Sequence, residues 1–267
     1  MTKLKGRIAI ITGAGRPGNI GEAVCAAFLE EGAAGVVATD LREAEALVLA
    51  DCFGSERFVF QPHDVASEAD WQRVVDVTLE RFGGIDILVN NAGMGMAGDS
   101  TTLALEDFRK TMDVNLYGAF LGTKYCAPPI AERAALHAGG GAIINVSSMA
   151  AYMPNAHNIA YHCSKSALRM LTLCTSKELG PQGIRVNSVH PGPIMTPLLK
   201  EAFKRYSKAG MYASPEDAEQ RIAASSPLGR TSTPDEIARL FVYLASDDAS
   251  YITGTAIAHD GGVGSVF

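Results

Sequence analysis

Short apolar runs alternate with helical patterns along almost the whole chain, at a spacing of about thirty residues. Each run is rich in Ile, Val and Ala and is typical of a strand that is buried on both faces of a sheet. The predicted strands span residues 7–12, 35–39, 57–61, 85–89, 142–146, 184–189 and 255–259. Strand–helix–strand units of this kind form parallel sheets. The chain is therefore predicted to be a single α/β domain, a doubly wound parallel sheet of about seven strands with helices on both faces.

Helical patterns fill the intervals between these strands. They span residues 20–31, 42–53, 103–126, 161–179 and 234–245. A further helix is predicted to begin at Ser67, where Asp70 completes a variant of the capping box. The pattern at 103–126 is predicted to break at Pro128 and Pro129, because proline lacks a backbone N–H.

A glycine-rich turn follows the first predicted strand. Residues 12–21 read TGAGRPGNIG and lead directly into a helix. Glycines in this context let the backbone approach a pyrophosphate, and the amino terminus of the helix binds it. The alternative is a tight turn with a purely structural role.

Asp40 ends the second predicted strand. A carboxylate at this position accepts hydrogen bonds from an adenosine ribose and repels a 2′-phosphate, so NAD is favoured over NADP. Arg16 and Arg42 weaken this preference, because either guanidinium is able to pair with a phosphate. A helix N-cap is the competing interpretation of Asp40.

Tyr161 and Lys165 lie four residues apart in a predicted helix and so share one face. At about 4 Å and an effective dielectric of about 20, the ammonium favours the phenolate by about 4 kcal/mol, which brings the pKa of Tyr161 from about 10 toward neutrality. Ser148 follows the strand at 142–146, where its hydroxyl would face the tyrosine across a small substrate. A proton transfer to or from an alcohol oxygen is the chemistry that these groups predict. The alternative is a solvated surface pair.

Three more polar residues lie at positions that indicate a functional role. Asp64 and Asn91, after the third and fourth strands, are expected to bond an adenine and to hold the coenzyme loop. Asn115 lies inside a helical pattern, where an amide is unfavourable unless its hydrogen bonds are useful. Its alternative is a solvated helix asparagine.

These motifs together resemble the short-chain dehydrogenase/reductase family over essentially the whole chain. The resemblance is carried by Thr12-Gly13, Asn90-Asn91-Ala92-Gly93, Asn115, Ser148, Tyr161-x-x-x-Lys165 and Pro191-Gly192. It implies a Rossmann-type sheet that binds NAD(P), with Tyr161 as general acid/base and Lys165 lowering its pKa and binding the nicotinamide ribose. Ser148 would bond the substrate oxygen, and Asn115 would hold a water in a proton relay from Lys165.

The resemblance also predicts the coenzyme contacts. The expected residues are Gly13, Arg16, Gly18, Asn19, Ile20, Gly21, Asp40, Leu41, Asp64, Val65, Asn91, Ala92, Gly93, Tyr161, Lys165, Pro191, Gly192, Ile194 and Thr196. Ile194 matches a backbone contact with the carboxamide, and Thr196 matches a position that holds the carboxamide or phosphates. Residues 196–232 are helical in pattern but irregular, and we interpret them as a substrate lid on one catalytic domain, residues 1–267.

One motif departs from the family pattern. The usual turn is T-G-x-x-x-G-x-G, whereas residues 12–21 look like a version with a two-residue insertion. Gly15, Gly18 and Gly21 also fit the G-x-x-G-x-x-G of longer relatives such as sugar-nucleotide epimerases, whose additional carboxyl-terminal substrate region we do not find here. The enoyl-thioester reductase branch is disfavoured because its tyrosine and lysine are more widely spaced.

The expected function is hydride transfer between NAD(H) and a secondary alcohol or ketone, with an apolar cyclic, aromatic or steroid-like substrate. One alternative is a coenzyme-binding regulator without turnover. Another is an epimerase that returns the hydride to its substrate. By resemblance alone, the helices around Asn115 and Tyr161 are expected to form a homotetramer or homodimer.

Net charge and composition argue against several classes of binding partner. The net charge is −6 and no basic cluster occurs, so nucleic acid and anionic membranes are not expected partners. The five cysteines lack C-x-x-C spacing, which indicates reduced, buried thiols and a cytoplasmic protein. The histidines show no metal-ligand spacing, so no metal is predicted. No apolar run is long enough to span a membrane, and no signal region precedes the first strand.

Overall fold

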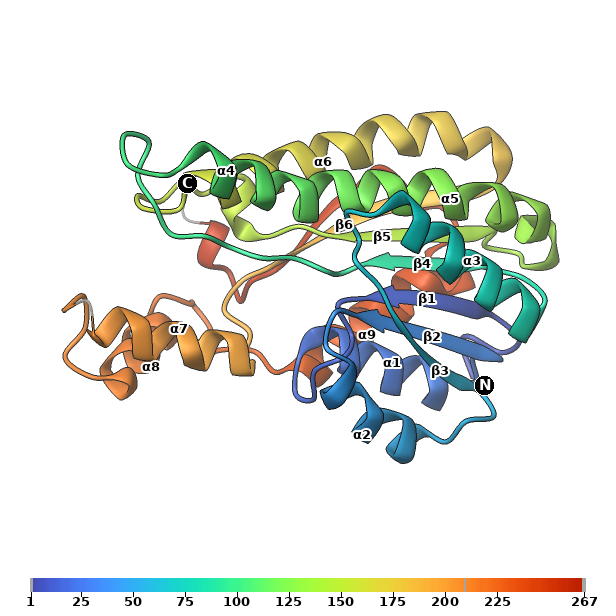
Figure 1. Cartoon of the computed structure of the whole chain (residues 1–267), viewed down its shortest axis with the longest axis horizontal. Coiled ribbons are helices and arrows are strands. Elements are labelled where there is room, and N and C mark those ends of the chain that lie inside the picture. Colours follow the sequence, from blue (N-terminus) through green and yellow to red (C-terminus); the bar gives the residue numbers. More distant parts are fainter. Residues whose placement is uncertain (1, 209, 266–267) are drawn as a thin grey trace.

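The computed structural model describes residues 2–208 and 210–265, and it confirms the predicted parallel sheet. Seven strands lie in the order β3-β2-β1-β4-β5-β6-β7 (Figure 1). They are β1 (Ile8–Thr12), β2 (Gly35–Asp40), β3 (Phe58–Pro62), β4 (Ile87–Asn90), β5 (Gly141–Val146), β6 (Ile184–Pro191) and β7 (Ala256–His259). Because β1 pairs in parallel with both β2 and β4, the strand order reverses at this point. Such a reversal marks the place where open α/β sheets bind ligands.

Side chains on the two faces of the sheet enter two separate hydrophobic cores. Along β1, Ala9 and Ile11 pack into one core, whereas Ile10 between them packs into the other. The same alternation on β5 sends Ile144 to the first core and Ile143 to the second. Successive side chains of a strand point to opposite faces, so a strand that is covered on both sides must be apolar throughout. This explains the continuous apolar runs in the sequence.

Helices cover both faces of the sheet (Figure 1). One face carries α1 (Ile20–Glu30), α2 (Glu43–Phe53) and α9 (Pro234–Ala245), and the other carries α3 (Glu68–Phe82), α5 (Gly118–Arg133) and α6 (Ile159–Leu179). Phe28 of α1 and Phe241 of α9 are fully buried in the first core. Trp71 of α3 and Ile130 of α5 are fully buried in the second.

The predicted helix break at Pro128 and Pro129 is wrong. α4 (Leu105–Met112) continues through a π-helical turn, Asp113–Tyr117, into α5, which contains both prolines. Proline has no backbone N–H, so one carbonyl group in the preceding turn of the helix loses its hydrogen-bond partner. Pro128 is exposed, so water is able to bond this carbonyl. Burial of Ile130 on the other side of α5 holds the helix together.

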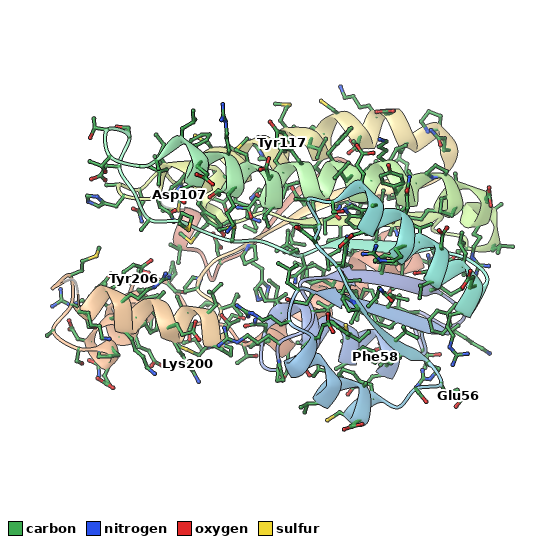
Figure 2. All side chains as sticks on the ribbon, in the orientation of Figure 1. Glu56, Phe58, Asp107, Tyr117, Lys200 and Tyr206 are labelled. Atoms are coloured by element: carbon green, nitrogen blue, oxygen red, sulfur yellow. The ribbon has the colours of Figure 1, made fainter. Side chains whose placement is uncertain are left out.

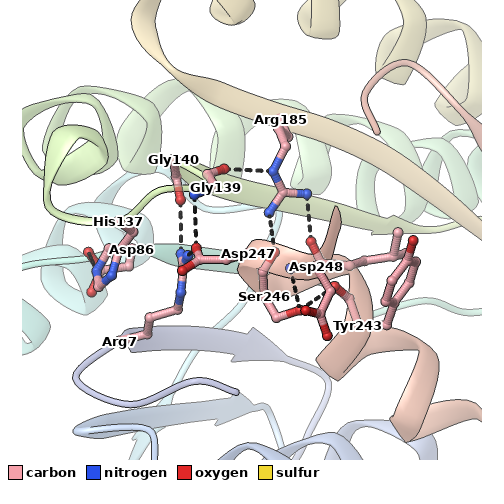
Figure 3. Close-up of polar contacts among 11 residues, drawn as sticks. Arg7, Asp86, His137, Gly139, Gly140, Arg185, Tyr243, Ser246, Asp247 and Asp248 are labelled. Carbon is pink, nitrogen blue, oxygen red and sulfur yellow. Dashed lines mark hydrogen bonds and ion pairs between the residues drawn. The ribbon is translucent and has the colours of Figure 1, made fainter. Parts of the chain in front are cut away.

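Two buried arginines tie together the edge at which the strands begin (Figure 3). Arg185 of β6 donates hydrogen bonds at 2.7, 2.7 and 3.2 Å to the carbonyl oxygens of Gly139, Leu244 and Ser246. Just before β1, Arg7 pairs with Asp247. These contacts join β1, β6 and the end of α9, so this edge is closed by polar bonds and the opposite edge is left for a ligand.

Residues 196–232, the predicted lid, form a projection from the edge at which β6 ends (Figure 1). It contains α7 (Pro197–Lys208) and α8 (Pro215–Ala224), while residue 209 lies outside the described residues. At its base the N–H of Ser232 donates to Pro193 at 3.0 Å, and the N–H of Met195 donates to the carbonyl of Ser232 at 2.8 Å. The two ends of the projection are therefore fastened to each other.

The prediction that the thiols are buried is wrong for most of them. Cys25 and Cys126 are buried, and burial raises the pKa of both. Cys52, Cys163 and Cys174 are exposed. A helical pattern does not determine which of its faces is covered, and these three side chains lie on solvent-facing sides of α2 and α6.

Candidate active site

The glycine-rich turn after β1 is held against the loop after β4. Gly13 has a φ of +66°, which favours glycine, and a Cβ at this residue would lie 2.7 Å from the Cα of Ala92. The side-chain amide of Asn91 donates to the carbonyl oxygens of Thr12 at 2.8 Å and of Gly13 at 3.0 Å. Asn91 thus holds the turn that the sequence predicts to contact a coenzyme.

The amino terminus of α1 fits a dinucleotide. Asn19 makes no side-chain capping bond, and its buried Oδ1 has no partner among the described residues. Uncapped first-turn N–H groups favour a phosphate, and a buried acceptor without a donor suits a ligand hydroxyl or a water. Gly18 and Ile20 flank Asn19, and a Cβ on Gly21 would lie 2.6 Å from the carbonyl of Gly13. Glycine is therefore the residue that fits at position 21.

Asp40 links the same turn to the end of β2. Its carboxylate accepts hydrogen bonds from the backbone N–H groups of Gly15 at 3.1 Å and Arg42 at 3.2 Å. Arg16 extends to the projection, where it pairs with Glu201 of α7. Leu41 is 70% exposed, so its side chain lies at the periphery of the site.

Asp64 and Val65 follow β3 at the same edge. Asp64 accepts a hydrogen bond from the N–H of Ala66 at 3.0 Å, and its own N–H donates to Asp70 at 2.9 Å. Val65 is buried, and its carbonyl accepts a hydrogen bond from Trp71 at 2.9 Å. Local bonds therefore fix this loop. The capping interaction predicted at Asp70 is only partly present, because its carboxylate bonds the N–H of Asp64.

Ser148 and Tyr161 meet at the end of β5. A hydrogen bond joins their side chains. Ser148 has an extended backbone, with φ −169° and ψ 160°, and its Oγ accepts a hydrogen bond from the N–H of Ala150 at 3.1 Å. Tyr161 lies in the first turn of α6. Two hydroxyl groups are thus presented side by side to one ligand oxygen.

Lys165 lies one helical turn beyond Tyr161 and is only 3% exposed. Its Nζ donates to the carbonyl of Val146 at 2.7 Å and is 5.7 Å from the centroid of the Tyr161 ring. Burial lowers the pKa of Lys165 to about 8. A Cβ on Gly93 would lie 3.3 Å from this Nζ, so the loop after β4 passes directly over the lysine.

The predicted lowering of the Tyr161 pKa by Lys165 is wrong in this structure. Burial raises the pKa of Tyr161, and the hydrogen bond with Ser148 opposes this effect without cancelling it. The ammonium of Lys165 is directed at the carbonyl of Val146, so desolvation of the phenol outweighs its charge. Tyr161 is therefore a neutral phenol near pH 7, which is the proton-donating form.

Asn115 lies in the π-helical turn and is 1% exposed, so the alternative of a solvated helix asparagine is wrong. Its side chain accepts from the N–H of Met94 at 2.8 Å and donates to the carbonyl of Met94 at 2.8 Å and to Ser164 at 2.9 Å. A π-turn widens a helix by one residue and is frequent at functional sites. Asn115 therefore joins the loop after β4 to α6.

The segment after β6 borders the same region. β6 ends at Pro191, and a Cβ on Gly192 would lie 2.7 Å from the Cα of Asp260. Ile194 is buried, and Thr196 accepts an N–H of the first turn of α7 through its hydroxyl. The structure thus gathers every predicted site residue at one edge of the sheet, with Leu41 outermost and the Arg16 guanidinium paired with α7.

Sequence reasoning missed His190, which is fully buried in β6 and bonded to the carbonyl of Ser148 at 2.9 Å. The available signal was its position two residues before Gly192, at a strand end. His162 and Cys163 do not face each other, because Nδ1 of His162 lies 2.8 Å from the carbonyl of Ala150 and Cys163 is exposed.

The predicted site residues at this edge carry hydroxyls, amides, the two carboxylates of Asp40 and Asp64, the Lys165 ammonium and the Arg16 guanidinium. Among the residues that the structure describes, no group of three or more His, Cys, Asp or Glu side chains is placed to hold a metal ion. In the same described residues, we find no helix whose length and apolar character would let it cross a membrane.

Known proteins match this chain over nearly its full length. A family model described as enoyl-(acyl carrier protein) reductase matches residues 13–264. A 3-alpha-(or 20-beta)-hydroxysteroid dehydrogenase of Mycobacterium tuberculosis is 38% identical, over 97% of this chain and 90% of that protein. A trans-4-hydroxycyclohexanecarboxylate dehydrogenase of Sinomonas cyclohexanicum is 36% identical, over 96% of this chain and 92% of that protein. An NADP-dependent (R)-specific alcohol dehydrogenase of Lentilactobacillus kefiri is 34% identical, over 97% of each.

These matches cover the whole region in which the candidate active-site residues lie. The serine, tyrosine and lysine lie together beside a glycine-rich turn, and the uncapped helix that follows the turn fits a nicotinamide dinucleotide. The chain belongs to the short-chain dehydrogenase/reductase family, which uses nicotinamide coenzymes.

Proposed function

We propose that the protein is an NAD(H)-dependent oxidoreductase that interconverts a secondary alcohol and its ketone, with an apolar cyclic, aromatic or steroid-like substrate. The proposal depends on the contact between the hydroxyl groups of Ser148 and Tyr161 beside the buried Lys165. Relatives named for hydroxysteroid, hydroxycyclohexanecarboxylate and alcohol dehydrogenation support this substrate class. The four-residue spacing of Tyr161 and Lys165 argues against the enoyl-thioester reduction that the family model's description names.

Four side chains share the proton transfer and the stabilisation of charge. When bound, the dinucleotide supplies hydride-transfer chemistry. Ser148 donates a hydrogen bond to the substrate oxygen, with its Oγ already oriented by the N–H of Ala150. Tyr161 gives its proton to that oxygen in reduction and takes it back in oxidation. Lys165 stabilises the phenolate that remains, and we propose from the family resemblance that Asn115 holds a relay water near Lys165.

The substrate pocket is proposed to lie between Tyr161 and the lid, residues 196–232. Tyr206 of α7 is close enough to Tyr161 to raise its pKa, and the Tyr206 ring centroid is 6.3 Å from that of Tyr212. Figure 2 shows Tyr206 on the side of α7 that faces α4, and Lys200 on the opposite side. Aromatic rings on this side suit a flat, apolar substrate.

The proposed activity is tested with a panel of secondary alcohols, including hydroxysteroids and cyclohexanols, incubated with NAD and followed by NADH absorbance. Net NADH formation with a cyclic alcohol supports the proposal. A coenzyme-binding regulator would bind NADH but give no turnover with any alcohol in the panel. An epimerase would invert a carbinol centre without net NADH release.

The coenzyme preference depends on the charge of Asp40. The unmutated protein is expected to have a higher kcat/KM with NAD than with NADP, because the carboxylate repels a 2′-phosphate. Asp40→Ala should shift the ratio toward NADP by about a hundredfold, since a like charge at about 6 Å costs roughly 2 to 3 kcal/mol. The guanidinium of Arg42, two residues along the chain, would then attract the 2′-phosphate without a competing carboxylate at position 40.

Steady-state kinetics with both coenzymes measure this ratio. Asp40→Asn keeps the shape of the side chain and should shift the ratio in the same direction. Asp76→Ala on the exposed side of α3 is the matched control and should leave the ratio unchanged. Equal kcat/KM values for the two coenzymes in the unmutated protein would contradict the preference for NAD.

Ketone reduction should lose rate as the pH rises through about 8. Burial lowers the pKa of Lys165 to about 8, so the ammonium is fully present below that pH and is lost above it. Without the ammonium, the phenolate left by Tyr161 is no longer stabilised. Tyr161 itself stays protonated in this range because burial raises its pKa. The measurement is kcat/KM for reduction from about pH 6 to about pH 10. Lys165→Met should be slow at every pH and show no break near 8, and a wild-type rate that rises through this range would contradict the assignment.

We further propose a homodimer or homotetramer that is assembled through α5 and α6. Tyr117 and Phe120 are 52% and 49% exposed, and Met170 of α6 is 58% exposed. Large exposed apolar side chains on neighbouring helices support an interface there. Light scattering measures the oligomeric state.

The exposed free thiols of Cys163 and Cys174 support a location in the reducing cytoplasm.

A further inference from the structure

The carbonyl group of Ser148 is fixed by two donors from different parts of the chain. Ser148 is the N-cap of a short 3-10 helix, Met149–Ala151, and within that turn its carbonyl accepts the N–H of Ala151 at 3.0 Å. The second donor is Nδ1 of His190, at 2.9 Å, which reaches across from β6. A peptide plane held from both sides cannot rotate freely, so the direction of the Ser148 side chain is set by the position of this imidazole.

The surroundings of His190 determine its tautomer. The ring is fully buried, with Nδ1 facing the carbonyl of Ser148 and Nε2 facing the Ser188 hydroxyl at 2.9 Å. A carbonyl oxygen only accepts hydrogen bonds, so the proton is on Nδ1 and Ser188 donates to Nε2. Burial lowers the pKa of His190, which keeps the ring in this neutral form.

The other contacts of the ring hold it in place. Its centroid is 5.5 Å from that of Tyr152, whose hydroxyl lies 3.5 Å from Asp260. The carboxylate of Asp260 accepts the backbone N–H groups of Gly262 and Gly264. The turn after β7 therefore supports Tyr152, and Tyr152 covers one face of the imidazole.

We propose that His190 is a positioning residue for the hydride-transfer reaction, which acts through Ser148. By donating from Nδ1 to the Ser148 carbonyl, it holds the serine in the extended conformation that places Oγ beside the Tyr161 hydroxyl. The inference rests on the proposed role of Ser148. It adds a residue that touches neither substrate nor coenzyme but decides how well the serine is aimed.

Two substitutions separate the hydrogen bond from the bulk of the ring. His190→Leu keeps the side chain large but removes both nitrogen atoms, and it should lower kcat by about tenfold or more, since a small misplacement of a reacting group is costly. The KM for NADH should change much less than kcat, because the turn that fits the phosphates is held by Asn91 and not by His190. His190→Asn places an amide N–H near the position of Nδ1 and should recover most of the lost kcat. His137→Leu is the matched control, because His137 bonds Asp86 at the opposite edge, and its kcat should equal that of the wild type.

A double-mutant cycle with Ser148→Ala tests whether the effect passes through the serine. If His190 acts only on Ser148, His190→Leu should lower kcat by less than about twofold in the Ser148→Ala background. An equal loss of kcat in both backgrounds would mean that the ring supports the fold in general, and it would overturn the proposal. Wild-type kcat for His190→Leu would overturn it as well.

An experiment without turnover separates this proposal from the proposed function. Nitrogen NMR of ¹⁵N-histidine-labelled protein should give an imidazole protonated at Nδ1 whose signal disappears in His190→Asn, whereas the signal of His162, whose Nδ1 also faces a carbonyl, should remain. Protonation at Nε2 alone would overturn the proposal even in an active enzyme. If Ser148→Ala keeps the wild-type kcat, the role of Ser148 in the proposed function fails, and the positioning role fails with it.

Discussion

Replacement of Tyr161 by phenylalanine is expected to lower kcat by about 10²- to 10⁴-fold, the usual contribution of a positioned general acid. The substitution removes one oxygen atom and leaves the ring in place. Its hydroxyl is hydrogen-bonded to Ser148, whose Oγ is oriented by the N–H of Ala150. Tyr206 is near enough to affect the pKa of Tyr161, but it belongs to α7 in the lid, residues 196–232, and not to the helix that carries Tyr161.

The loss should appear in turnover and not in coenzyme affinity. NADH binding, followed by fluorescence, should stay within about threefold of wild type, because the turn that fits the phosphates is held by Asn91. Tyr125→Phe is the matched control: its hydroxyl bonds Glu68 on the exposed side of α5, so its kcat should not change. A Tyr161→Phe enzyme with the wild-type rate would remove the basis of the proposed function.

Replacement of Arg185 by methionine is expected to lower the free energy of unfolding by about 3 to 5 kcal/mol, because three carbonyl oxygens lose a charged donor. Methionine fills much of the same space but offers no N–H group. The carbonyls of Gly139, Leu244 and Ser246 lie at a closed edge of the sheet, where the arginine itself is 6% exposed. Each of these carbonyl oxygens would stay buried without a hydrogen-bond donor, which destabilises the folded state.

Urea unfolding followed by circular dichroism measures this loss, and the thermal midpoint should fall by about 10 °C. Arg221→Met is the matched control, because Arg221 forms an exposed ion pair with Asp217 one turn away on α8, and exposed pairs contribute less than about 1 kcal/mol. The kcat of a folded Arg185→Met protein should be near wild type, since the arginine lies at the edge opposite the proposed site. Equal stability of the Arg185 and Arg221 variants would show that the carbonyls find water instead.

Prediction from sequence worked where neighbours along the chain decide the outcome. The seven strands follow from continuous apolar runs, and the Tyr161–Lys165 pair follows from the period of the helix. Asn91 and Gly13 were predicted at one edge because parallel strands end there together, and the structure brings them into contact.

Prediction failed where a distant segment supplies the environment. The lowered pKa expected for Tyr161 assumed a free ammonium nearby, but Val146 accepts a hydrogen bond from Lys165, and burial raises the pKa of the phenol. The helix break expected at Pro128 and Pro129 ignored the burial that holds α5 on the sheet. A stretch of a few residues in the sequence reveals neither the burial of Tyr161 nor the packing of α5 on the sheet.

Local patterns in the amino-acid sequence specify the order of strands and helices along the chain, the glycine turn that fits a dinucleotide, and the residues that gather at the strand ends. These features depend on local periodicity and on the common direction of parallel strands, which a short stretch of chain already specifies. Which groups are desolvated, and which carbonyl each donor reaches, follow from the packing of the whole fold, as His190 on Ser148 and Arg185 at the opposite edge illustrate. The physical reason is that solvation and hydrogen bonding depend on atoms brought together from residues tens of positions apart, and only packing makes them neighbours.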